Sequence, residues 1–309
     1  MDNQFAEQYI NLEDTILDDL DFDNLKEVFP RLEKQKELAD KSGVWKYRVR
    51  SRRMIIKMGY EFDDLERSMG ELIWLAGQWE MNKEDSDLED AMILLERFIE
   101  FLPAFPNVAP NDIHQAIEIL KEWFATTSRE LHYLVWALFK TYSKLGDLTV
   151  AEEYKQQLLK LEAVTPFGFK SDHPSCETCL TCKKIHYYAS IGLLQKAMEI
   201  AEPLLEDDVD PCLTSPRTGL SYLLDAYLDA GKLAEIEILL PTFTQHLDMP
   251  TKAPVRIVLP LLRYYIITKN QQEIDKIIDN YNPIIKDLAD RWSAQKFLSL
   301  VNLEKEINI

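Results

Sequence analysis

Apolar residues recur at steps of three and four along most of this chain. Between residues 131 and 145 they are Leu131, Leu134, Val135, Leu138, Tyr142 and Leu145. This spacing places them in one stripe along an α-helix. Residues 152–161 show the same spacing, and the strand-like run at 255–259 is short and lies between two prolines. The pattern therefore predicts an all-α fold.

The predicted helices form pairs that share a spacing of key residues. A tyrosine is followed four residues later by glycine and, five residues after that, by a small residue. Two copies are Tyr142, Gly146, Ala151 and Tyr188, Gly192, Ala197; a third is Tyr227, Gly231, Ile236, and a fourth is assigned to Ile266, Asn270, Asp275. Glycine accepts the left-handed conformation that ends a helix, and alanine lets two helices approach closely. The pattern indicates successive helical hairpins.

This spacing resembles the tetratricopeptide repeat over roughly residues 130–285, although repeats of that family run about 34 residues and these are longer. The resemblance implies a right-handed α-solenoid of stacked helical hairpins whose curved face binds a protein or a peptide. We expect irregular helical hairpins over residues 1–128 and tetratricopeptide-like repeats over residues 129–309. The repeats include a cysteine-bearing hairpin at residues 173–216.

All four cysteines lie within that hairpin. They are Cys176, Cys179, Cys182 and Cys212. Residues 183–190 and 195–206 are predicted helices, and if they pack antiparallel the chain returns to the end that it left. Cys-x2-Cys spacing together with a distant cysteine is typical of a closed, structural zinc site. The sequence therefore predicts one structural Zn²⁺ ion held by four thiolates.

Other interpretations of these cysteines stay open. His186 lies four residues after Cys182, on the same helical face, and His173 lies nearby, so either imidazole could replace one thiolate. The cysteines could also be ordinary buried thiols, or serve in disulfides or a redox pair. The first ten residues lack the basic start and apolar core of a secretion signal, which favours a reducing, cytoplasmic location.

The charge balance bears on the partner. The chain carries 53 acidic and 35 basic residues, a formal net charge of −18. Such a field repels nucleic acid and anionic lipid and favours a basic partner. No apolar run reaches the roughly 18 residues that a membrane span needs, so we expect no membrane contact.

One basic run stands out against this background. Lys46, Arg48, Arg50, Arg52 and Arg53 follow a stretch of 40 residues that holds twelve acidic and four basic side chains. Arg48 and Arg52 share one helical face, so we expect them to pair with the acidic N-terminal stretch or with carboxylates at positions 61, 63 and 64. The alternative is a site for nucleic acid or an acidic peptide.

The sequence shows no catalytic motif. The five histidines are scattered, and no zinc-protease, phosphate-loop or nucleophile-elbow pattern occurs. We therefore expect a non-enzymatic protein that binds a basic protein or peptide, one form being an immunity or inhibitor protein that covers a basic toxin. The alternatives are a peptide-sensing or scaffolding regulator and a metal-dependent enzyme with an open zinc position. Tyr133, Tyr187 and Tyr222 are expected either to anchor the partner or to pack against the next repeat.

Overall fold

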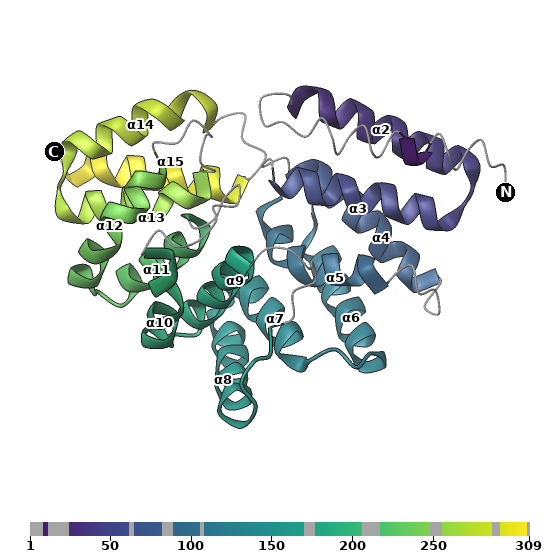
Figure 1. The fold of residues 1–309 in the computed structure, drawn as a ribbon, viewed down its shortest axis with the longest axis horizontal. Coiled ribbons are helices and arrows are strands. Elements are labelled where there is room, and N and C mark those ends of the chain that lie inside the picture. Colours follow the sequence, from purple (N-terminus) through teal and green to yellow (C-terminus); the bar gives the residue numbers. More distant parts are fainter. Residues whose placement is uncertain are drawn as a thin grey trace. The chain divides into compact units, whose positions relative to one another are not determined.

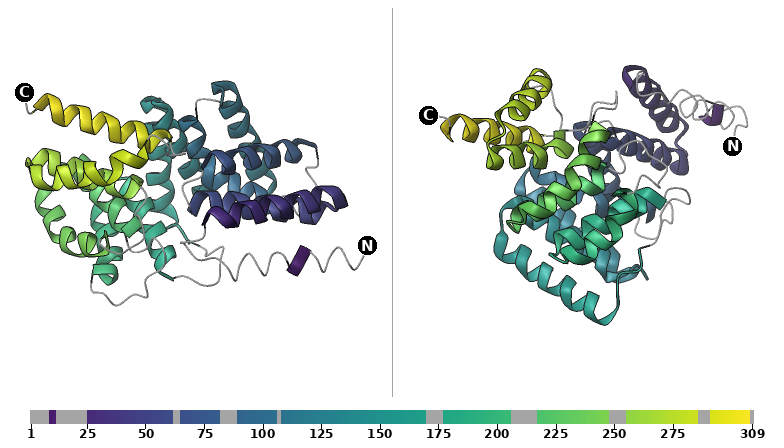
Figure 2. Two further views of the ribbon diagram at one scale, coloured as in Figure 1. Left: turned by 90° about the horizontal axis from the view of Figure 1, so that it is seen from above. Right: turned by 60° about the vertical axis from the view of Figure 1, so that its left-hand side comes forward.

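The computed structural model describes residues 9–11, 25–61, 65–81, 89–105, 108–169, 177–205, 217–247, 255–285 and 291–307. Every regular element in these ranges is a helix and none is a strand (Figure 1), as two further orientations also show (Figure 2). The predicted all-α fold is thus confirmed for the described ranges.

The described chain divides into two compact units, one ending at Tyr154 and the other beginning at Lys155. The first unit contains α2 (Leu25–Ser42), α3 (Trp45–Glu61), α4 (Leu65–Met81), α5 (Glu89–Phe98), the 3-10 helix η3 (Ile99–Ala104), α6 (Pro110–Thr126) and α7 (Leu131–Leu145). The division falls inside α8 (Leu148–Val164). The second unit contains α9 (Glu177–Ser190), α10 (Leu194–Leu205), α11 (Arg217–Asp229), α12 (Leu233–Leu247), α13 (Val255–Thr268), α14 (Gln271–Ile285) and α15 (Arg291–Ile307).

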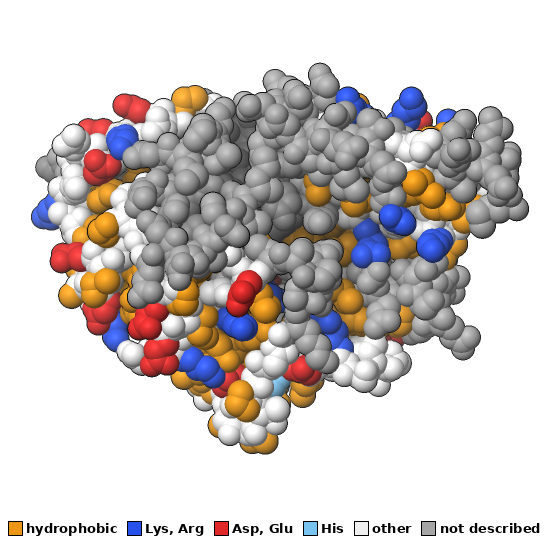
Figure 3. Space-filling view, viewed as in Figure 1, with side chains coloured by type: hydrophobic (Ala, Val, Ile, Leu, Met, Phe, Trp, Pro, Cys, Tyr) orange, Lys and Arg blue, Asp and Glu red, His pale blue; other side chains and the backbone are white. Residues whose placement is uncertain are grey.

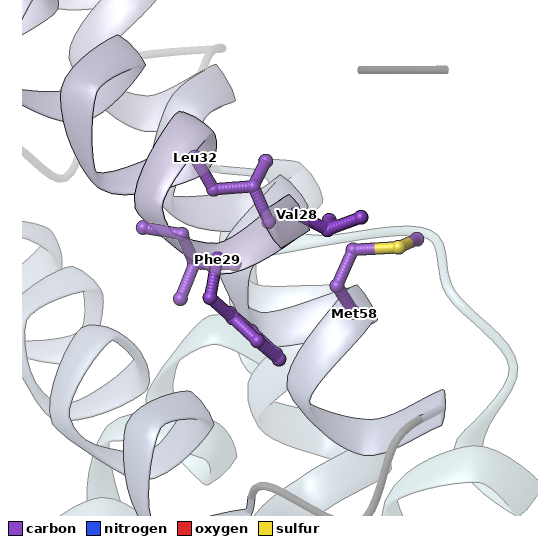
Figure 4. Packing of buried hydrophobic residues seen from close by; sticks show 5 residues of the cluster. Val28, Phe29, Leu32 and Met58 are labelled. Atoms are coloured by element: carbon purple, nitrogen blue, oxygen red, sulfur yellow. The ribbon is translucent and has the colours of Figure 1, made fainter. Parts of the chain in front are cut away.

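The first unit begins with a helical hairpin closed by apolar side chains. Apolar residues three and four apart on α2 meet apolar residues three apart on α3, and each set forms one stripe. The resulting buried cluster consists of Val28, Phe29, Leu32, Ile55 and Met58 (Figure 4). Since Val28 and Phe29 lie near the start of α2 and Met58 lies near the end of α3, the two helices are antiparallel.

Helices of the second unit pack in a repeated order. Each of α9, α11 and α13 packs against the helix that follows it, which makes three hairpins. The first helices also pack on one another, since α9 contacts α11 and α11 contacts α13, and α13 contacts the last described helix, α15. The first helices therefore lie in one continuous layer within this unit.

Helices α7, α9, α11 and α13 all end in the same turn. A residue one or two positions after the helix has a positive φ, and the N–H of the residue that follows it donates to a tyrosine carbonyl five positions earlier, as in a Schellman motif. The positive-φ residues are Gly146, Gly192, Gly231 and Lys269, with φ of 79°, 85°, 68° and 56°. The accepting carbonyls belong to Tyr142, Tyr188, Tyr227 and Tyr265. The glycine positions predicted for the first three hairpins are confirmed.

The fourth hairpin differs from its prediction by one residue. Lys269 takes the place of glycine, Tyr265 takes the place of the tyrosine, and Ile274 is the buried residue of the second helix. The sequence assignment of Asn270 and its companions was therefore wrong. It followed asparagine, which adopts the left-handed conformation more readily than most residues other than glycine, whereas the turn places that conformation on Lys269.

We predict that Lys269→Gly stabilises the protein by about 1 kcal/mol, because a residue with a Cβ is strained at this φ. The matched control is Asn270→Gly. Asn270 is the residue whose side-chain oxygen accepts from the N–H of Glu273 at 3.5 Å, so its replacement removes a cap and brings no relief. Thermal and denaturant unfolding of the two variants measure the difference. A gain from Asn270→Gly with none from Lys269→Gly would contradict the turn seen in the structure.

Candidate functional site

Helices α9 and α11 approach closely where the sequence predicts the zinc-stapled hairpin. A Cβ built on Gly219 would lie 2.9 Å from Sγ and 3.1 Å from Cα of Cys182. The ring of His186 stacks on that of Tyr222, with centroids 3.6 Å apart and planes 6° apart. The step from Cys182 to His186 on α9 thus runs beside the step from Gly219 to Tyr222 on α11. The two helices are parallel, and their N-termini lie at the same end.

The structure describes two of the four predicted zinc ligands. Cys179 is exposed and Cys182 is buried, one turn apart on α9. Cys176, Cys212 and the substitute candidate His173 lie outside the described residues. Within the described ranges, no group of three or more His, Cys, Asp or Glu side chains is placed to hold a metal ion. The chain was predicted to return to the end of the hairpin where α9 begins, and the start of α11 at that end confirms this. Zinc ligation itself stays a prediction.

His186 was the second substitute candidate for the zinc. Its ring face is covered by Tyr222. Because the ring nitrogens of an imidazole lie in the ring plane, this stacking does not prevent ligation, and the substitution also stays a prediction. The stack fixes the ring of His186 between the first helices of two successive hairpins.

Replacing Gly219 by alanine tests the close approach of α9 and α11. The added methyl group would overlap the Cys182 side chain and crowd its backbone, so we predict a destabilisation of about 1–2 kcal/mol, overpacking outweighing the better helix propensity of alanine. Gly70→Ala in α4 is the matched control, since apart from its two chain neighbours and the nearby backbone of its own helix no atom lies within 4 Å of the point that its methyl group would occupy. That control should gain up to about 1 kcal/mol. Equal gains in both variants, measured by thermal unfolding, would show that the helices are not so close.

A buried carboxylate fastens the chain between α8 and α9. Glu162 accepts hydrogen bonds from Lys196 Nζ at 2.7 Å, Tyr188 Oη at 3.1 Å, Tyr187 Oη at 3.4 Å and the Phe167 N–H at 3.1 Å. These four donors satisfy the hydrogen-bonding capacity of the Glu162 carboxylate. The aromatic ring of Phe167 also packs against Tyr187, with centroids 4.9 Å apart. The segment that leads toward the predicted cysteine cluster is thus held against α9.

The ionisation of this cluster follows from its contacts. Burial opposes the charge on Glu162, but the hydrogen bonds from Lys196, Phe167 and Tyr188 outweigh it and lower the pKa of the carboxyl group. Burial likewise opposes the charge on Lys196, and its bonds to Glu162 and Tyr188 raise its pKa. Burial, followed by the nearby Glu162 charge, raises the pKa of Tyr187 far above its ordinary value. At neutral pH Glu162 and Lys196 therefore form an ion pair, and Tyr187 and Tyr188 stay protonated. Such a cluster stabilises the fold and has no catalytic feature.

Side chains of the first helices form a polar row across the second unit. Arg263 Nη1 of α13 lies 3.3 Å from Asp225 Oδ1 and 2.5 Å from Asp229 Oδ1, both on α11. Lys296 Nζ of α15 lies 4.0 Å from the other carboxylate oxygen of Asp225. We call these residues and the aromatic stack the first-helix row. Its members are His186, Tyr222, Asp225, Asp229, Arg263 and Lys296.

The three tyrosines that were considered as anchors for a partner differ in their burial. Tyr133 is 2% exposed and Tyr187 is fully buried, so neither can contact a partner directly, and that part of the prediction was wrong. Tyr222 is half-buried and belongs to the first-helix row. First helices have neighbours on several sides, so a residue beside a packing position is often buried as well. Only the contacts between helices could reveal this.

The basic run on α3 is paired as expected. Arg48 Nε lies 3.1 Å from Asp40 Oδ1, and the Arg52 guanidinium donates to both oxygens of Asp40 at 2.9 Å. Arg52 also lies 3.2 Å from Glu71 and 3.8 Å above the ring of Trp74. The pairing with the N-terminal stretch is confirmed through Asp40. The contact with Glu71, which lies on α4, has no signal in the local sequence.

No helix in the described ranges is long and apolar enough to cross a membrane. No protein-family model matches the chain, and no curated protein is significantly similar to it in sequence.

Proposed function

We propose that this chain is a non-enzymatic, tetratricopeptide-like helical-repeat protein that binds a protein or peptide along its first-helix row. One observation carries the proposal: α9 packs on α11, α11 on α13 and α13 on α15, and α9, α11 and α13 end in turns of the same geometry. Such stacking brings residues from distant parts of the sequence onto one surface. We therefore propose a right-handed solenoid in which this surface is the binding face.

The chemistry of the row suits a peptide or a protein segment. Tyr222 offers a half-buried ring whose position is held by the His186 stack, and rigid aromatic residues are frequent anchors of interfaces. Asp229 remains 66% exposed although it touches Arg263. Surface ion pairs of this kind contribute little to folding, so their groups can exchange partners at small cost.

Net charge supports a basic partner. A formal charge of −18 raises the rate at which a cationic protein arrives and disfavours nucleic acid. An immunity or inhibitor protein that covers a basic toxin in the cytoplasm is the most concrete form of this proposal. A scaffolding or peptide-sensing regulator would use the same row.

We also propose that the four cysteines hold a structural zinc ion. The support is the parallel packing of α9 and α11. Cys176 directly precedes α9 and Cys212 precedes α11, and the starts of these two helices lie at the same end of the pair. Zinc there would join the starts of two neighbouring first helices. Its binding free energy would then add to the stability of the fold.

The binding proposal is tested with a purified partner, identified by affinity capture and mass spectrometry. We expect an association rate that falls as salt is raised above about 0.15 M, where the Debye length is about 8 Å. Tyr222→Ala and Asp229→Ala should each weaken binding about tenfold, whereas Glu202→Ala, an exposed change on the second helix α10, should not. A rate indifferent to salt would exclude the basic partner, and unchanged affinity in both row variants would exclude the row.

The zinc proposal is tested by metal analysis of protein purified without chelator. We expect one zinc per chain and a lower melting temperature for Cys212→Ser, because an incomplete site loses affinity and leaves the loop untied. Zinc far below one per chain, with all thiols titrating at once, would contradict it. A Cys212→Ser protein that stays stable but no longer binds its partner would show instead that the metal is functional.

A further inference from the structure

A cavity of about 150 Å³ lies within the first unit, where α4, α5 and α6 contact one another. Its lining is mainly aliphatic. Helix α4 contributes Ala76 and Gly77, α6 contributes Ala116, and Leu95 of α5 and Leu102 of η3 lie against the same space. Small residues at the contact of two helices leave room that larger side chains would fill in a close-packed interior.

The cavity is open to solvent on one side. Ile73, which lines it from α4, is 50% exposed, and Asp112, which lines it from α6, is exposed as well. Leu95 and Leu102 are buried, so they form its inner part. Hydrophobic side chains are visible at the surface over the region of α3 and α4 in Figure 3. A ligand would therefore enter with its apolar end first and keep a polar group at the rim.

Neither the backbone nor the packing of α4 requires glycine at position 77. Gly77 lies inside the helix and has no positive φ. Apart from its two chain neighbours and the nearby backbone of its own helix, no atom lies within 4 Å of a Cβ built on it. Glycine inside a helix is less favourable than alanine, and here the missing side chain leaves the cavity open. Position 77 is therefore the point from which a side chain can fill the cavity.

Asp112 determines the charge of the rim. Among the described residues that line the cavity, it alone is charged. Its Oδ2 accepts from the Ala109 N–H at 3.2 Å, at the start of α6, which holds the carboxylate in place. A carboxylate has about four lone-pair sites, so this bond leaves capacity for a cation. The rim attracts a cationic group and disfavours an anionic one, as does the formal net charge of −18.

We propose that this cavity binds a small amine, whose apolar body fills the space between α4 and α6 and whose ammonium group pairs with Asp112. An apolar cavity of about 150 Å³ holds a molecule the size of benzene, which sets the size of the body. Aliphatic walls offer no hydrogen bond to a polar body, whereas the carboxylate offers a charge-assisted one to an ammonium group. The site belongs to the first unit and is independent of the first-helix row, whose residues belong to the second.

The test is a titration of the full-length protein with three probes of one size, namely benzylamine, benzyl alcohol and benzoate, followed by ligand-observed NMR. We expect benzylamine to bind with a dissociation constant on the order of 1 mM. Benzoate should bind at least about tenfold more weakly, because its charge is repelled. Asp112→Asn keeps an acceptor for the Ala109 N–H, so it should weaken benzylamine by about threefold to fivefold and leave benzyl alcohol unchanged.

Filling the cavity tests its location. Gly77→Leu should weaken benzylamine and benzyl alcohol by about tenfold or more, because probe and side chain would overpack the same space. Gly70→Leu is the matched control: it makes the same change in the same helix, at an exposed position that does not line the cavity. It should leave both affinities unchanged. Thermal unfolding of the two variants checks that each is folded.

Three results would overturn the proposal. One is the absence of saturable benzylamine binding up to about 10 mM, tenfold above the expected constant. Another is an equal effect of Gly77→Leu and Gly70→Leu, which would place the amine elsewhere. The third is a benzylamine affinity that Asp112→Asn does not change, which would remove the ion pair. Because Asp112 is exposed, this last variant decides the matter even where Gly77→Leu fails to fold.

Discussion

The end of each first helix is the constraint on which the helical hairpins depend. A helix that continued past residue 146, 192, 231 or 269 would carry its apolar stripe into solvent. One residue in the left-handed conformation reverses the chain, and two backbone hydrogen bonds close the turn. The second helix then starts close to the first, and Ala151, Ala197, Ile236 and Ile274 near its start are buried. Hairpin geometry, and with it the packing of first helix on first helix, follows from these few residues.

Charged groups inside the fold are matched, and their matching is structural. Glu162 is surrounded by four donors, and Glu100 of η3 lies 2.8 Å from Lys140 and 3.3 Å from Lys144 on α7. Removing one partner of such a group would leave a buried charge uncompensated, which costs several kcal/mol. These clusters therefore specify which helices meet. The first-helix row differs because its charges reach solvent and can take part in binding.

Acidic residues outnumber basic residues over the whole chain, 53 to 35, which gives the formal net charge of −18. Such a field would raise the association rate of a cationic partner and disfavour nucleic acid, which is why the proposed function has a basic partner.

The sequence alone determined the all-α class, the hairpins and three of the four turns, because helical periodicity and the preference of glycine for positive φ are local properties. It also identified the pairing of Arg48 and Arg52 with the acidic N-terminal stretch, since opposite charges close in sequence meet readily in a hairpin. The tertiary structure decided what depends on contacts between helices. Lys269 adopts the left-handed conformation because the hydrogen bonds of its turn require it, and Tyr133 and Tyr187 are buried because neighbouring helices cover them. Gly219 lies against Cys182, and Asp225 meets Arg263, across 37 or 38 residues of sequence. Such pairs have no periodic signal, because the packing of whole helices, and not the local chain, brings them together.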